Sequence, residues 1–176
     1  AIESFLPAGS RLYVEDIVGG PSELRVFSSA GASLGKVALP SISSIGGLVH
    51  AQGDVALVRT ESYTEPGRWW RYDPSAKKLS LTALVQKSPA TFVGVEVTRV
   101  FATSKDGTKV PLNLLYRKGT KLDGKAPVLL YGYGGYGISE TPSFSASRQV
   151  FIEQGGIIHG RAGGGPALRG RSRRQL

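Results

Sequence analysis

Few residues in this sequence could carry out covalent chemistry. The chain has 176 residues and no cysteine, and its only histidines are His50 and His159. The absence of cysteine excludes a cysteine nucleophile and a thiolate metal site. The two histidines are not spaced as a pair of metal ligands, so we expect neither a metal ion nor any other cofactor.

One serine lies in a pattern that is typical of a nucleophile. Gly31-Ala32-Ser33-Leu34-Gly35 matches G-x-S-x-G, the motif of a nucleophile elbow. Such an elbow needs a strand before the serine and a helix after it. Here residues 24–27 and 36–39 both have the composition of strands. We therefore predict a plain hairpin turn at Ser33.

A second pattern lies at residues 132–137, where the sequence matches G-x-G-x-x-G. The pattern follows an apolar run and precedes a predicted helix, which is the context of a dinucleotide-binding loop. A nucleotide site would also need an acidic residue at the end of the next strand. Residues 157–160 contain none, and Thr141-Pro142 lengthens the loop before the helix. A nucleotide-binding α/β module that uses Gly132 to Gly137 remains the alternative interpretation.

The elements before residue 87 are predicted to be short strands joined by tight turns. Apolar and aromatic runs recur about every 8 to 15 residues, a spacing typical of β-sandwiches, barrels and propellers. A propeller blade takes about 40–50 residues, so this region could hold two blades. Trp69 and Trp70 are expected to pack within a blade. The predicted strands are residues 11–18, 24–27, 36–39, 55–60, 68–72 and 79–82.

The pattern changes near residue 88. A hairpin is predicted from residues 95–102 and 110–116, with its turn at Asp106-Gly107. The apolar run 126–131 suits a strand that is buried on both faces. A helix over 144–154 and a strand from Ile157 complete a βαβ unit of the α/β class, with Gly155-Gly156 ending the helix.

Several segments resemble the prolyl oligopeptidase family of serine peptidases. Residues 101–111 are similar to the stretch where that family leaves its propeller and enters its hydrolase domain, and residues 131–142 resemble its glycine-rich loop. Gly19-Gly20-Pro21-Ser22 and residues 69–74 resemble its last blades. The implied fold is mixed β then α/β. Residues 1–87 would be closing propeller blades, 88–159 the start of an α/β-hydrolase domain, and 160–176 a divergent Arg/Gly-rich tail.

The resemblance also implies a function. The family cleaves short peptides after proline, so short proline-containing peptides are the expected partners. Tyr133 occupies the place of the tyrosine that donates to the oxyanion, and Tyr136 that of an aromatic residue lining the proline pocket. The family's Ser/Asp/His triad is expected beyond this chain. We therefore predict that the chain alone is inactive and, with incomplete sheets, marginally stable or prone to aggregate.

The tail accounts for much of the net charge of +9. It departs from the family pattern after Gly156, and a shifted reading frame is one hypothesis for that departure. Clustered arginines could also bind phosphates, but no aromatic residues lie between them, so we expect no nucleic-acid partner. No apolar run approaches 18 residues and no signal pattern starts the chain, so we expect no membrane partner and a cytoplasmic location, with the periplasm as alternative. The tail arginines are Arg161, Arg169, Arg171, Arg173 and Arg174.

Overall fold

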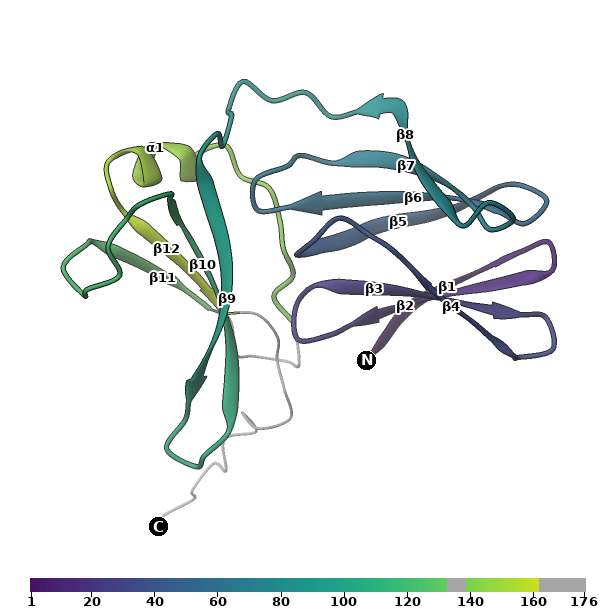
Figure 1. The fold of residues 1–176 in the computed structure, drawn as a ribbon, viewed down its shortest axis with the longest axis horizontal. Helices are drawn as coiled ribbons and strands as arrows, with labels where there is room; N and C mark the ends of the chain where they lie inside the picture. Colours follow the sequence, from purple (N-terminus) through teal and green to yellow (C-terminus); the bar gives the residue numbers. More distant parts are fainter. Residues whose placement is uncertain (133–138, 162–176) are drawn as a thin grey trace, which may run out of the picture.

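The computed structural model describes residues 1–132 and 139–161, which form three four-stranded sheets and one short helix (Figure 1). The first two sheets are antiparallel and follow the chain in the orders β1-β2-β3-β4 and β5-β6-β7-β8. The third has the order β11-β12-β10-β9. The elements are β1 (Ile2–Ala8), β2 (Arg11–Ile17), β3 (Ser22–Ser28), β4 (Ser33–Val37), β5 (Ser43–Gln52), β6 (Val55–Ser62), β7 (Arg68–Asp73), β8 (Lys78–Val85), β9 (Val95–Thr103), β10 (Lys109–Arg117), β11 (Val128–Tyr131), α1 (Arg148–Glu153) and β12 (Ile157–Arg161).

The first sheet confirms the hairpin prediction at Ser33. Ser33 begins β4, directly after a turn in which the Gly31 amide donates to the Ser28 carbonyl at 2.9 Å. Gly31 has a φ of 85°, a conformation that glycine adopts without steric cost. The residues after Ser33 form a strand rather than a helix, so Ser33 is not a nucleophile elbow.

The sequence patterns missed two strands. β1 opens the first sheet, and β5 opens the second. β5 carries Gly46-Gly47, which weakened its strand signal. The structure explains both glycines. A side chain at Gly46 would meet the Arg59 guanidinium at 2.4 Å, and one at Gly47 would lie 3.2 Å from the Trp69 ring. The glycines thus make room for large side chains of the same sheet, and Trp69 packs within its blade as predicted.

The first two sheets share one apolar core. Alternate residues of each strand enter it, as the two-residue period of a strand requires. Tyr13 and Tyr72 come from different sheets and meet edge to face, with ring centroids 6.0 Å apart. The pair of four-stranded sheets, with their common core, matches two neighbouring blades of a propeller. The buried members are Ala8, Tyr13, Leu24, Val26, Val37, Ala56, Val58 and Tyr72.

The third sheet contains the predicted hairpin and the predicted βαβ unit. β9 and β10 are antiparallel, and the Gly107 amide closes their turn on the Ser104 carbonyl. β11 and β12 are parallel and are joined through α1. The helix is shorter than the predicted 144–154, because residues 139–145 form no regular secondary structure and residues 146–147 form a turn. It ends at Glu153, and Gly155, with a φ of 83°, follows the C-cap Gln154, in agreement with the predicted glycine stop. That this sheet begins an α/β-hydrolase domain stays a prediction.

The expectation of a buried strand at residues 126–131 is wrong for this structure. All four residues of β11 are at least half exposed, with Leu130 at 67%. β11 forms one edge of its sheet, and α1 packs against β12 and β10 instead. The sequence pattern indicated how apolar the strand is, but burial depends on whether neighbouring elements cover it.

Candidate functional site

Tyr133, predicted to be the oxyanion donor, and Tyr136, predicted to line the proline pocket, both lie outside the described residues. Their flanks are described. β11 ends at Tyr131, directly before Gly132, and the chain resumes at Ser139 in an extended segment that leads to α1. The glycine-rich sequence is thus anchored by a sheet strand before it and by residues 139–147 after it.

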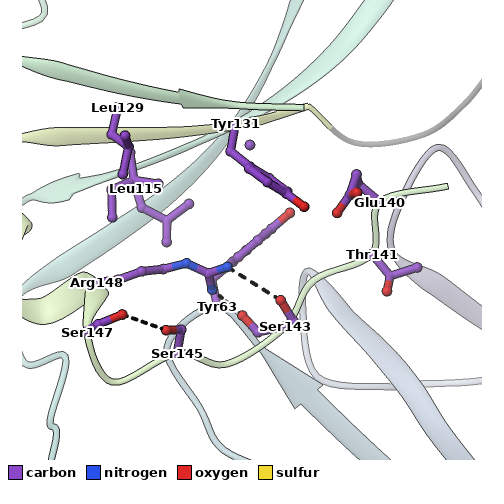
Figure 2. Close-up of a pocket in the computed structure, with 12 residues that line it drawn as sticks. Tyr63, Leu115, Leu129, Tyr131, Glu140, Thr141, Ser143, Ser145, Ser147 and Arg148 are labelled. Carbon is purple, nitrogen blue, oxygen red and sulfur yellow. Dashed lines mark hydrogen bonds between the residues drawn. The ribbon is translucent and has the colours of Figure 1, made fainter. Parts of the chain in front are cut away.

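A pocket of about 340 Å³ lies beside these flanks (Figure 2). It is bounded by the third sheet, by the segment before α1 and by Tyr63, which follows β6 of the second blade. Figure 2 shows the hydroxyl ends of Tyr63 and Tyr131 pointing toward Glu140. The pocket therefore brings together a blade residue, the end of β11 and the segment after the glycine-rich sequence. Its lining residues are Tyr63, Leu115, Leu129, Tyr131, Glu140, Thr141, Ser143, Ser145, Ser147, Arg148, Ile158 and Gly160.

Arg148 supplies the positive charge of this pocket. Its guanidinium lies 5.4 Å from the centroid of the Tyr63 ring and donates to the Ser143 carbonyl. Partial burial lowers the pKa of Arg148 below its usual range. No carboxylate forms an ion pair with it among the described residues. Nothing in the sequence indicated that Arg148 has specific partners, because the predicted helix over 144–154 placed Arg148 beyond its first turn.

Tyr63 also connects the second blade to the third sheet. The Asn113 amide nitrogen of β10 donates to the Tyr63 hydroxyl at 2.9 Å, and both side chains are buried. Burial raises the pKa of Tyr63, and the hydrogen bond from Asn113 lowers it by less. Asn113 was detectable as a polar residue within the apolar strand β10, but nothing in the sequence indicated Tyr63 as its partner.

Within the described part of the chain, the site contains no pair of nucleophile and base. Among the described residues, His50 Nε2 contacts only the Gly53 carbonyl, at 2.8 Å, and the side chain is exposed. Nε2 of His159 is buried without a partner, and burial lowers the pKa of this histidine. Among the described residues, the hydroxyls of Ser145 and Ser147 bond only to each other, at 2.9 Å. This arrangement can bind and orient a polar group, but it lacks an activated serine.

Residues 1–132 and 139–161 also contain no cluster of three acidic or histidine residues that could hold a metal ion. In that same part of the chain, no helix is long and apolar enough to cross a membrane.

Comparison with known proteins identifies the family. No protein-family profile matches the chain. Prolyl oligopeptidase A of Galerina marginata is 34% identical over 143 residues, which are 77% of this chain and 19% of that protein. The prolyl endopeptidase of Elizabethkingia miricola is 30% identical over 148 residues, covering 82% of this chain and 20% of that protein. The chain belongs to the prolyl oligopeptidase family.

Solved structures of prolyl oligopeptidases agree with this assignment. One, from a study of two prolyl endopeptidases, superposes with a TM-score of 0.80 at 33% identity and covers 92% of this chain and 24% of its own. Prolyl oligopeptidase B of Galerina marginata gives a TM-score of 0.75 at 26% identity, covering 93% of this chain and 24% of its own. The comparisons do not support the nucleotide-binding alternative. The chain spans about a fifth of the length of the curated relatives it matches.

Proposed function

We propose that this chain is the part of a proline-specific serine peptidase in which two propeller blades meet the first strands of the peptidase domain. Its catalytic contribution is the oxyanion donor Tyr133, and its contribution to specificity is Tyr136. The observation that supports the proposal is that one similarity at 33% identity and a TM-score of 0.80 runs through all three sheets. The loop with both tyrosines follows β11 directly.

The proposed chemistry is stabilisation of a developing negative charge. During attack on a peptide carbonyl, the carbonyl oxygen becomes an oxyanion, and a fixed hydroxyl donor lowers the energy of that state. In α/β-hydrolases, one such donor comes from the loop after the third strand. Tyr133 offers a phenolic O–H in a loop of this kind. Its effect is specific to the transition state, so it should act on kcat.

The proposed substrates are short peptides that contain proline. The relatives named above are prolyl oligopeptidases and prolyl endopeptidases, and a relative from Galerina marginata has been solved with a macrocyclization substrate. The described part of this chain contains no nucleophile and base within hydrogen-bond distance, so we predict that the 176-residue polypeptide alone does not hydrolyse a Gly-Pro chromogenic peptide. Turnover that persists through stringent purification would contradict this.

A graft tests the role of Tyr133. Residues 1–157 would replace the matching segment of the Elizabethkingia miricola prolyl endopeptidase, and hydrolysis of a proline-containing chromogenic peptide would be measured. We expect the graft to be active. Tyr133→Phe should lower kcat by about 10²–10³-fold, as removal of one oxyanion donor does elsewhere, with KM nearly unchanged.

The matched control is Tyr72→Phe. It removes the same hydroxyl from a tyrosine in the shared core of the two blades, outside the pocket, and kcat should stay within about twofold. Equal losses in the two variants of an active graft would remove Tyr133 from the mechanism.

A further inference from the structure

The segment that follows the glycine-rich loop is held almost entirely by side chains. Residues 139–144 form no helix or strand and make no backbone–backbone hydrogen bond to any other described residue. Such a segment has no ladder to fix its path, so its position depends on individual contacts. Three side-chain contacts fix the position of this segment, and the most buried of them comes from the second blade.

That contact joins Ser44 to Pro142, which are 98 residues apart. The Ser44 hydroxyl donates to the Pro142 carbonyl at 2.6 Å, and both residues are buried. Proline has no N–H, so the carbonyl is the only backbone group through which Pro142 can form a hydrogen bond. A buried carbonyl without a partner is costly, and Ser44 is therefore the residue that satisfies it.

The two other contacts hold the residues that follow Pro142, at Ser143 and Phe144. The Phe144 ring meets Phe92 edge to face at 5.7 Å, and Arg148 donates to Ser143 while lying over Tyr63. Tyr63 belongs to the same blade as Ser44 and follows β6, the strand paired with β5. The second blade thus contacts the chain on either side of Ser143 and Phe144, at Pro142 through Ser44 and at Arg148 through Tyr63. Figure 2 shows Tyr63 and Arg148 together.

We propose that Ser44 is a positioning residue. Its hydroxyl ties the backbone at Pro142 to the second blade and thereby sets the path of the chain that follows the glycine-rich sequence. The second blade then contributes to the peptidase site by orienting the backbone beside it. The catalytic consequence rests on the proposed function of Tyr133, whereas the positioning itself does not.

The adjacent serine provides a matched control. Ser43 is also buried in β5, at 2% exposure, and its hydroxyl also donates to a proline carbonyl at 2.6 Å. That proline is Pro40, three residues earlier, in the connection between β4 and β5. Ser43→Ala and Ser44→Ala therefore remove equivalent hydrogen bonds, and only the second one involves the segment after the loop.

Hydrogen exchange on the 176-residue chain tests the positioning. In Ser44→Ala, the amides of Arg148 and Gln149, which donate to the Ser145 and Ala146 carbonyls just beyond this segment, should exchange about threefold to tenfold faster, the factor expected for one hydrogen bond. Ser43→Ala should leave these amides unchanged. Ser44→Thr keeps the hydroxyl and should restore slow exchange. If Ser44→Ala does not fold, Ser44→Cys, with its weaker donor, takes its place. Equal exchange in the Ser43 and Ser44 variants would overturn the proposal.

Kinetics in the graft test the catalytic consequence. Ser44→Ala should lower kcat by about threefold to tenfold with KM unchanged, and Ser44→Thr should recover the activity. Loss of activity in Tyr133→Phe with no change in Ser44→Ala would refute the kinetic role of Ser44 and leave the proposed function standing. The reverse pattern would refute Tyr133 as the donor, and hydrogen exchange would still decide the positioning.

Discussion

At the scale of single residues, hydroxyl groups connect distant parts of this chain. Ser44, Tyr63 and Tyr13 each bond to a residue at least 41 positions away. None of these pairs has a sequence signature, because a hydroxyl is equally common at the surface. Asn113 was weakly signalled as a polar residue within an apolar strand, whereas nothing in the sequence indicated the contacts of Arg148.

Tyr13 leads to a prediction on pH. Its hydroxyl donates to the Asp54 carbonyl, and burial raises its pKa to about 12. In the unfolded chain the pKa is about 10, so the unfolded state loses this proton first. The contribution of Tyr13 to the free energy of unfolding should therefore be constant below pH 10 and fall as the pH rises toward 12.

Urea denaturation between pH 8 and pH 11.5 measures this effect. Tyr13→Phe should be less stable at pH 8 by about 1 kcal/mol, because one hydrogen bond is lost. It should also show a shallower fall at high pH, with the remaining slope coming partly from Tyr72, whose pKa burial also raises. Identical slopes in the two proteins would show that Tyr13 does not titrate in this way.

At the scale of elements, β11 is the least protected strand. It is a four-residue edge strand without charge, and the side chains on both of its faces are exposed. Unpaired edges of this composition recruit further strands. In the first two sheets, by contrast, similar apolar strands are covered by the neighbouring sheet.

We therefore predict that β11 drives self-association of the 176-residue chain. Leu130→Lys should shift the chain toward monomer in size-exclusion chromatography with light scattering, because a charge on an edge strand opposes pairing. Val93→Lys is the control, since Val93 is even more exposed, at 89%, but lies outside the sheets. A similar effect of both substitutions would mean that general hydrophobicity, rather than the β11 edge, causes association.

At the scale of the whole molecule, the first blade and the third sheet are joined by Arg99. Its guanidinium donates to the Val18 and Gly19 carbonyls at 3.2 and 2.7 Å. Gly19 has a φ of 63°, and a side chain there would meet Arg99 at 2.5 Å. This contact joins parts of the chain that are 80 residues apart.

Gly19→Ala tests how strongly the two parts are joined. It should destabilise the chain by about 1–2 kcal/mol from backbone strain and by a further 1–2 kcal/mol from the displaced Arg99 bonds, as measured by urea denaturation. Gly31→Ala is the control, because Gly31 has a φ of 85° with open space around it and should show the strain alone. Equal losses would mean that the Arg99 contact adds nothing to stability.

The sequence by itself determined the strands, the turns and the family. The local signals were the two-residue alternation of the strands, Asp106-Gly107 and Gly155. The backbone has the geometry that these signals predict, because each depends on neighbouring residues alone. The segments at residues 101–111 and 131–142 were enough to indicate prolyl oligopeptidases, and the comparisons confirmed this. The sequence patterns did not predict β1 and β5, because pairing with neighbouring strands, rather than their own composition, makes them strands.

Only the tertiary structure decided which residues meet and which surfaces are covered. It placed Ser44 against Pro142 and Tyr63 against Asn113, and it left β11 exposed although its composition is that of a buried strand. The physical reason is the same in each case. Burial and long-range hydrogen bonds depend on what packs nearby in space, and a residue's own sequence neighbourhood does not contain that information.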